Sequence, residues 1–245
     1  ARRKPDSTRE KILHFARQQL GDAVDADLHF NPSYKPWDQR LCIAPNGDLF
    51  RALRKGNANI VTDHIERFEA EGVRTRGGEL LEADIIVTAT GLNIQLFGGA
   101  TLSLDGQPVE TGERLIYKGM MLDGVPNMAF AFGYTNASWT LKCDLTAQYV
   151  CRLLQRMDKR GEVVCIPERR EGVVADDMVD LESGYIQRAK DFLPQQGTRA
   201  PWRVHQNYVM DLAVTRFTKL DDGTMRFLAQ PSRTESPAKA ATQAA

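Results

Sequence analysis

The stretch Asp84-Ile85-Ile86-Val87-Thr88-Ala89-Thr90-Gly91-Leu92-Asn93 decides the fold that we expect for this chain. Three consecutive β-branched residues, Ile85 to Val87, lack polar alternation, which is typical of a strand buried on both faces of a parallel sheet. Gly91 then lets the backbone leave the sheet and pass close to a bulky group, because glycine has no side chain. Ligands of open α/β sheets bind beyond such strand ends. The pattern alone fits a ligand-binding strand end or an ordinary core strand that ends in a turn.

The composition sets broad limits on the kind of protein. A chain of 245 residues, 42% of them hydrophobic, makes one large or two modest domains. Lys and Arg together equal Asp and Glu at 32 each, so the net charge gives no reason to expect a nucleic-acid partner. No apolar run approaches the roughly 18 residues of a membrane span. We therefore expect a protein without a transmembrane segment.

The cysteines do not indicate a metal centre. Cys42, Cys143, Cys151 and Cys165 form no Cys-x-x-Cys pair and have no histidine at metal-ligand spacing. Reduced thiols in a cytoplasmic protein are the simplest interpretation. We therefore predict a cytoplasmic location and no bound metal.

Local patterns predict most of the secondary structure. A β-meander is expected over 64–82, a hairpin around Asp105-Gly106, and a disordered tail over 229–245. The predicted helices cover about 8–20, 48–55, 140–160 and 202–217, and the predicted strands cover 60–62, 85–89, 128–132 and 163–166.

Three blocks of sequence resemble one enzyme family. They are ADIIVTATGLN (83–93), FNPSYKPWDQRLCIAPNGDLF (30–50) and YKGMMLDGVPNMAFAFGYTNASWTLKCDL (117–145). Together they resemble class B flavin-containing monooxygenases of the Baeyer–Villiger type, in which the Ala-Thr-Gly segment links the NADP and FAD domains. The resemblance runs from about residue 17 to about residue 227 and implies that this chain is only the C-terminal half of such an enzyme.

The resemblance implies an α/β fold: an incomplete pair of dinucleotide-binding, Rossmann-like domains with a β-meander and C-terminal helices. Residues 1–85 would form the C-terminal part of the NADP-binding domain. Residues 86–228 would form the C-terminal part of the FAD-binding domain, and 229–245 the tail.

The implied reaction uses FAD, NADPH and O2. One oxygen atom would be inserted into a ketone or added to sulfur through a C4a-peroxyflavin. The pyrophosphate of each dinucleotide needs a Gly-x-Gly-x-x-Gly turn. No two glycines in this chain are separated by a single residue, so that turn cannot exist here. We therefore expect the chain alone to be inactive and to require the N-terminal half of the same enzyme.

Arg40 matches the active-site arginine of the family. A guanidinium cannot be deprotonated in proteins, so it can stabilise the negative charge of a peroxide anion and of a tetrahedral intermediate. Without the resemblance, Arg40 would be interpreted as a solvated loop residue. The link supplies further candidates for contacts with NADP or flavin, namely Thr88, Thr90, Gly91 and Asn93.

The small polar loop 133–138 enters the predicted helix 140–160. A helix N-terminus offers free N–H groups and a positive dipole end, which suit a flavin carbonyl that gains negative charge on reduction. The candidate flavin contacts are Asn136, Ser138, Trp139 and Thr140. Each polar residue in this set could instead be a simple N-cap, and Trp139 could instead pack in the core.

Two other functions remain open at this point. An FAD/NAD(P) disulfide reductase shares the strand-and-link arrangement, but it needs a redox-active cysteine pair that this sequence lacks. A non-catalytic remnant or binding module could also keep these half-domains.

Overall fold

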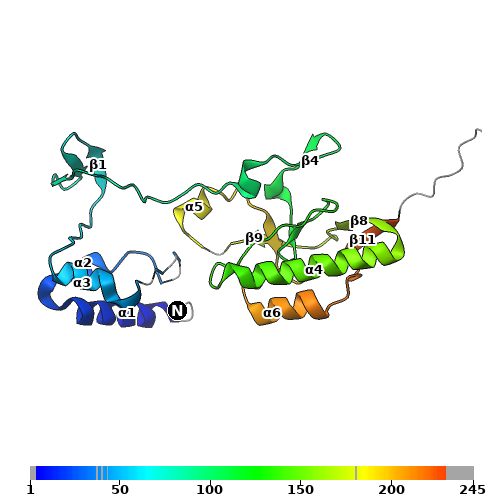
Figure 1. The fold of residues 1–245 in the computed structure, drawn as a ribbon, viewed down its shortest axis with the longest axis horizontal. Helices are drawn as coiled ribbons and strands as arrows, with labels where there is room; N and C mark the ends of the chain where they lie inside the picture. Colours follow the sequence, from blue (N-terminus) through cyan, green and yellow to red (C-terminus); the bar gives the residue numbers. More distant parts are fainter. Residues whose placement is uncertain (1–3, 37, 40, 43, 180, 230–245) are drawn as a thin grey trace, which may run out of the picture. The chain divides into compact units, whose positions relative to one another are not determined.

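The computed structural model describes residues 4–36, 38, 39, 41, 42, 44–179 and 181–229. The chain divides into two compact units (Figure 1). Unit 1 comprises 1–94 and 180–188, and unit 2 comprises 95–179 and 189–245. The assignment of 1–85 to an NADP-binding part and of 86–228 to an FAD-binding part stays a prediction. The predicted disordered tail lies outside the described residues, except for Ala229, which is the last residue of a strand.

Unit 1 begins with a helical cluster. Its helices are α1 (Pro5–Leu20), α2 (Ala26–His29) and α3 (Asp48–Arg54), with 3-10 turns η1 (Gly21–Ala23) and η2 (Pro45–Gly47), and the short helix α5 (Gly184–Gln187) belongs to the same unit. Pro5 suits the first turn of α1, where its missing N–H costs no hydrogen bond. Buried residues of α1, α2 and α3 form a common core: Ala16, Leu20, Ala26 and Leu53. The predicted helices at 8–20 and 48–55 are confirmed.

The predicted meander is also confirmed. Strands β1 (Ile65–Phe68), β2 (Gly72–Thr75) and β3 (Leu80–Glu82) form an antiparallel sheet in the order β1-β2-β3. A β-carbon on Gly72 would lie 2.0 Å from the carbonyl oxygen of Leu81, so only glycine fits at the start of β2.

Two strands predicted in unit 1 are absent. Residues 60–62 and 85–89 have no strand structure. Ile85, Ile86 and Val87 are 83%, 42% and 83% exposed, so the expectation of a strand buried on both faces is wrong here. A parallel strand needs neighbours from distant parts of a chain, and the described residues supply none at 85–89. The apolar run therefore lies in the link without a strand partner.

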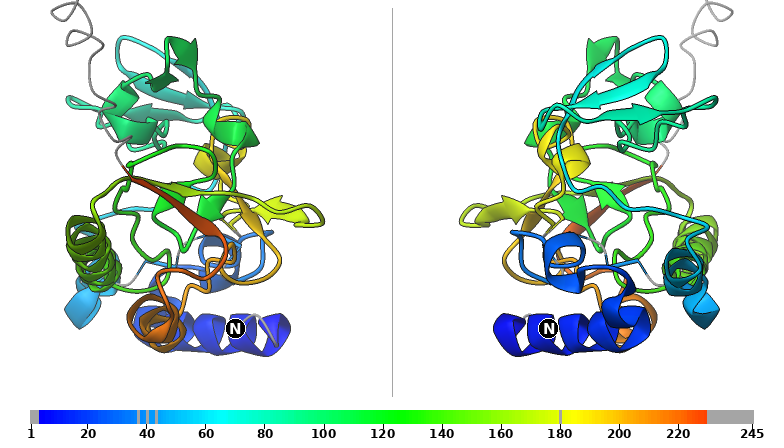
Figure 2. Two further views of the ribbon diagram at one scale, coloured as in Figure 1. Left: turned by 90° about the vertical axis from the view of Figure 1, so that its right-hand side faces the viewer. Right: turned by 90° about the vertical axis from the view of Figure 1, so that its left-hand side faces the viewer.

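Unit 2 contains short antiparallel strand pairs with one long helix at their side (Figures 1 and 2). Its strands are β4 (Ser103–Leu104), β5 (Gln107–Pro108), β6 (Ile116–Tyr117), β7 (Met121–Leu122), β8 (Glu162–Pro167), β9 (Ala175–Asp177), β10 (Gln195–Gly197) and β11 (Met225–Ala229). The pairs are β4 with β5, β6 with β7, β9 with β10, and β8 with β11. The hairpin around Asp105-Gly106 and the strand at 163–166 are confirmed.

All sheets formed by the described residues are antiparallel. The chain therefore has a mixed α/β fold of helices and small antiparallel sheets. The Rossmann-like part of the predicted fold is not confirmed.

The long helix α4 (Trp139–Arg160) confirms the prediction of a helix at 140–160. It ends at Gly161, whose left-handed backbone (φ 64°) closes the helix. The buried face of α4 carries Leu145, Tyr149, Leu153 and Met157. Leu141 lies at the same helical spacing but is exposed. The core of unit 2 consists of Leu115, Tyr117, Met120, Met121, Tyr149, Leu153, Met157, Cys165, Trp202 and Met225.

Two predicted elements of unit 2 are absent or shorter than expected. The predicted strand at 128–132 is absent. The predicted helix at 202–217 is shorter, because only α6 (Tyr208–Leu212) and the π-helical turn η5 (Ala213–Phe217) form. The remaining 3-10 turns are η3 (Leu96–Gly99) and η4 (Thr111–Glu113). No helix within the described ranges is long and apolar enough to cross a membrane.

Candidate functional site

The N-terminal turn of α4 is the first part of the candidate site. Ser138 is the N-cap residue, with an extended backbone, but its side chain makes no capping hydrogen bond. Its hydroxyl instead lies 2.7 Å from the hydroxyl of Thr140. The N–H groups of the first turn are therefore not satisfied by the N-cap side chain and can donate to a ligand. A helix of 22 residues also brings its positive dipole end to this point.

Gln206 fixes the loop that precedes α4. The Thr135 backbone N–H donates to the side-chain oxygen of Gln206 at 2.9 Å, and the Thr135 hydroxyl donates to the same atom at 3.2 Å. The side-chain amide of Asn136 donates to the Gln206 carbonyl at 3.2 Å. Because Asn136 is committed to this contact, its predicted flavin contact would have to use the remaining exposed atoms of its side chain.

Trp139 forms an exposed aromatic surface at the start of α4. Its residue surface is 50% exposed, and its ring lies 5.5 Å from the ring of Phe132. Gly133 passes directly under the indole, since a β-carbon there would lie 2.2 Å from Cγ of Trp139. Packing against Gly133 thus orients the ring without burying it, which fits a stacking surface better than a core residue.

A buried ion pair lies one turn further along α4. Nζ of Lys142 is 3.2 Å from Oδ2 of Asp211 on α6 and donates to the carbonyl of Lys118 at 3.3 Å. Burial lowers the pKa of Lys142, while Asp211 opposes that shift. Burial, together with Asp211, raises the pKa of the Tyr134 phenol. The pair ties α4 to α6 just behind the exposed turn.

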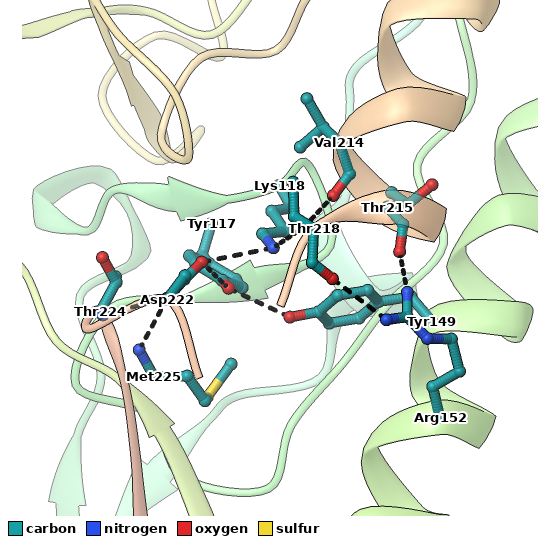
Figure 3. Close-up of polar contacts among 10 residues, drawn as sticks. All are labelled: Tyr117, Lys118, Tyr149, Arg152, Val214, Thr215, Thr218, Asp222, Thr224 and Met225. Carbon is teal, nitrogen blue, oxygen red and sulfur yellow. Dashed lines mark hydrogen bonds and ion pairs between the residues drawn. The ribbon is translucent and has the colours of Figure 1, made fainter. Parts of the chain in front are cut away.

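A second buried cluster connects β6, α4 and the turn before β11 (Figure 3). The Tyr117 hydroxyl donates to Oδ2 of Asp222 at 2.7 Å and lies 3.0 Å from the Tyr149 hydroxyl. Because Tyr117 has one proton and gives it to the carboxylate, Tyr149 must donate to Tyr117. Nζ of Lys118 lies 3.3 Å from the same carboxylate and donates to the Thr218 hydroxyl at 3.0 Å.

The charges of this cluster perturb one another. Burial lowers the pKa of Lys118, although Asp222 opposes the shift. Burial acts to raise the pKa of Asp222, but hydrogen bonds from Tyr117 and two backbone N–H groups, together with the charge of Lys118, hold that pKa below its usual range. Burial raises the pKa of Tyr117 and of Tyr149, so both phenols stay protonated. Both carboxylate oxygens of Asp222 accept hydrogen bonds from within the protein, so we interpret the cluster as structural.

The link residues lie in unit 1 and are exposed. Thr88 and Thr90 make no side-chain hydrogen bond within the described residues, and Gly91 adopts a φ of 105° that favours glycine. Oδ1 of Asn93 accepts a hydrogen bond from Nε of Arg188 at 3.1 Å, and the same guanidinium binds the Leu92 carbonyl at 2.9 Å. These candidates and those of α4 belong to different units.

Arg40 lies outside the described residues, and its predicted role stays a prediction. The loop before it is anchored at several points. The Arg9 guanidinium donates to the carbonyls of Pro32 and Tyr34 at 2.8 and 2.7 Å. The Asp38 carboxylate accepts from the Lys35 backbone N–H at 3.1 Å.

Sequence reasoning missed Gln206, Lys142 and Asp211. Lys142 carried a usable signal, because it lies three residues before Leu145 on the buried face of α4, where a charged residue needs a partner. Asp211 and Gln206 are distant in sequence from the residues that they contact, so no local pattern points to them. The described side chains form no group of three or more His, Cys, Asp or Glu that could hold a metal ion.

No protein-family model matches the chain. Curated relatives do match it. The FAD-containing monooxygenase EthA of Mycobacterium tuberculosis H37Rv is 51% identical over 229 residues, which are 93% of this chain and 47% of the relative. The probable FAD-binding monooxygenase AlmA of Acinetobacter baylyi is 47% identical over 93% of this chain and 46% of its own length. The putative FAD-containing monooxygenase MymA of M. tuberculosis H37Rv is 46% identical over the same shares.

The chain spans about half the length of the curated relatives it matches, and it matches the C-terminal half of EthA. The similarity extends over nearly the whole chain, so it includes the link, the loop before α4 and α4 itself. The resemblance to the C-terminal half of a flavin-containing monooxygenase, inferred from short blocks of sequence, is confirmed.

Proposed function

We propose that this chain is the C-terminal portion of an FAD- and NADPH-dependent monooxygenase of the Baeyer–Villiger type. The full protein inserts one oxygen atom from O2 beside a ketone carbonyl or adds it to sulfur. The observation that carries the proposal is 51% identity to the C-terminal half of a relative named as an FAD-containing monooxygenase. A cytoplasmic location fits NADPH as reductant and the four free thiols.

The start of α4 fits one edge of a flavin. The ring system is flat and apolar with a polar pyrimidine edge. The exposed Trp139 ring and the uncapped first turn offer a stacking surface beside N–H donors. The chain has no Gly-x-Gly-x-x-Gly turn for a pyrophosphate. The fit is therefore to the ring end of the cofactor, and the phosphates are held by the N-terminal half of the full protein.

Each candidate residue has a role in this arrangement. The bound flavin, once reduced by NADPH, supplies the activation of O2. The N–H groups of Trp139 and Thr140 donate to the pyrimidine edge, where negative charge accumulates on reduction. Ser138 holds the Thr140 hydroxyl beside that edge. Arg40 stabilises the negative charge that develops during oxygen transfer and orients the nicotinamide.

The link residues Thr88, Thr90, Gly91 and Asn93 contact the cofactors where the chain passes from one dinucleotide domain to the other. The exposed apolar run Ile85 to Val87 fits a longer protein, because the chain spans about half the length of its relatives and such a run is normally covered by further contacts. By itself the chain should bind FAD weakly and oxygenate nothing.

The alternatives are less well supported. A disulfide reductase needs a cysteine pair, yet all four cysteines are free thiols. Cys143 and Cys151 lie eight residues apart on α4, about 12 Å along the helix axis, which is too far for a disulfide. A non-catalytic remnant would give no oxygenated product in the experiment that follows.

A chimaera tests the proposal. The N-terminal half of M. tuberculosis EthA, which this chain does not match, is joined to the chain, and the product is purified. We expect bound flavin in its visible spectrum, NADPH oxidation, and an oxygenated product from a ketone or a thioether. Absence of flavin, or flavin without any oxygenated product from either substrate class, would falsify the proposal.

Arg40→Ala in the chimaera tests the catalytic assignment. This variant should keep the flavin and its reduction by NADPH but lose oxygenation at least a hundredfold, the loss typical of one removed electrostatic stabiliser. Arg76→Ala, an exposed arginine of the meander, is the matched control and should leave oxygenation unchanged.

A further inference from the structure

The C-terminal half of α4 carries a basic groove that the proposed function does not use. The groove has a volume of about 290 Å³ and is lined by Arg152, Gln155, Arg156, Lys159, Arg160 and Leu220. Trp139 and Arg156 are 17 residues apart on α4, about 25 Å along the axis. The groove is therefore separate from the candidate flavin site at the start of the helix.

The spacing of the cations gathers them on one side of the helix. Arg152, Arg156, Lys159 and Arg160 follow at i, i+4, i+7 and i+8, and like charges at such spacing repel one another. Among the described residues, Arg156 alone of these four forms ion pairs, with Glu162 and Asp221. Four cationic side chains less two carboxylates leave an excess of two positive charges in the groove.

Two of the guanidinium groups are held in place. Arg156 donates to both carboxylate oxygens of Glu162 at 3.1 and 3.3 Å and lies 3.7 Å from the ring centre of Phe227. Arg152 donates to the carbonyls of Thr215 and Thr218 (Figure 3). Within the described residues, Nη1 of Arg156 and Nε of Arg152 make no hydrogen bond, so each fixed group keeps a donor for a ligand.

The excess charge and the volume indicate the class of ligand. A monocarboxylate would leave one positive charge unmatched, whereas a phosphate group carries about −1.5 to −2 at neutral pH and offers three acceptor oxygens. The volume lies just below the usual range for sites that enclose a whole small molecule. The groove therefore matches a phosphate head whose remainder projects into solvent.

We propose that this groove binds the phosphate group of a ligand other than the flavin, and that its four cationic side chains, Arg152, Arg156, Lys159 and Arg160, are the donors. Gln155 and Leu220 border the groove and contact the part of the ligand next to the phosphate. The phosphate could belong to a soluble compound or to a lipid headgroup. The inference stands independently of the proposed monooxygenase function.

Calorimetric titration of the 245-residue chain with inorganic phosphate tests the groove. We expect saturable binding at one site, weakened at least tenfold by the double variant Lys159→Gln/Arg160→Gln, because two charge-assisted hydrogen bonds are lost. The matched control Lys55→Gln/Arg76→Gln removes the same charges from exposed positions of unit 1 and should change the affinity less than twofold. Both variants alter exposed side chains, and circular dichroism checks their folding.

Three outcomes would overturn the proposal: no saturable binding, equal weakening by both double variants, or unchanged binding by the groove variant. Vesicles of phosphatidylcholine with phosphatidic acid identify the source of the phosphate. Vesicle binding that inorganic phosphate displaces and the groove variant loses assigns a lipid headgroup. Phosphate binding without vesicle binding assigns a soluble compound. Vesicle binding that the groove variant retains, without phosphate binding, refutes the groove.

Discussion

Replacing Asp222 with alanine should destabilise unit 2 more than any neighbouring surface change. The carboxylate is the acceptor for Tyr117, the ion-pair partner of Lys118, and the acceptor for the N–H groups of Thr224 and Met225. The Lys118 side chain is 1% exposed, so its ammonium would stay buried without a counter-charge. Breaking such a pair costs about 3–5 kcal/mol. The Asp222 side chain is 19% exposed, which places the expected loss near the lower end, about 3 kcal/mol.

Urea unfolding measures this loss. The ring centres of Trp202 and Tyr117 lie 5.6 Å apart in the same core, so near-ultraviolet circular dichroism reports on this region. If the free energy of unfolding falls by roughly 2 kcal/mol for each molar of urea, the unfolding midpoint should fall by roughly 1.5 M. Asp221→Ala is the matched control. Its carboxylate is 61% exposed and, among the described residues, pairs with Arg156 alone, so its loss should stay below about 0.5 kcal/mol.

A small effect would refute the reasoning. If Asp222→Ala costs less than about 1 kcal/mol, Lys118 is either neutral or hydrated in the folded protein, and the cluster is not an ion pair in a dry environment. A second substitution sharpens the result. Adding Lys118→Met to Asp222→Ala should recover stability, because the unpaired charge is removed while the backbone strain at φ 50° stays the same. Further loss in the double variant would contradict this explanation.

Asp222, Gly133 and Lys142 give three further expected outcomes. Folding lowers the pKa of Asp222, so the stabilisation by its carboxylate is present above the ordinary pKa of aspartate and is lost as pH falls through the folded-state pKa. The difference in unfolding free energy between wild type and Asp222→Ala should therefore shrink in urea titrations at acid pH. Gly133→Ala places a β-carbon 2.2 Å from Cγ of Trp139 and so displaces the ring, and the chimaera should lose flavin absorbance while its far-ultraviolet circular dichroism is retained. Lys142→Met leaves the Asp211 carboxylate buried without its cation and should cost about 3–5 kcal/mol in urea unfolding.

Helices and strands whose hydrogen bonds and packing come from residues near in sequence were predictable. The helix 139–160 needs only its own backbone hydrogen bonds, an apolar face and Gly161 to end it, and all three are visible in the sequence. The meander 65–82 pairs each strand with the next one along the chain, so its turns set its register.

Elements that depend on distant partners were not predictable. The runs 60–62, 85–89 and 128–132 are rich in strand-forming or apolar residues, but a strand exists only when another strand supplies hydrogen bonds. The same limit applies to the candidate site. The helix start was found from a local pattern, whereas Gln206 holds the loop before α4 from 71 residues away.

The two groups of candidate cofactor contacts differ in how far they are organised in advance. Gln206, Gly133 and the Lys142–Asp211 pair, all within unit 2, fix the start of α4, so its donors can bind with little ordering. The link around Thr88 and Thr90 is exposed and makes few contacts, so ordering it would cost roughly 1–2 kcal/mol for each residue whose backbone becomes fixed. Contacts from the rest of the full protein to the exposed run Ile85 to Val87 would fix the link before a ligand arrives. This difference gives a physical reason why the chain alone should bind flavin weakly and the chimaera tightly.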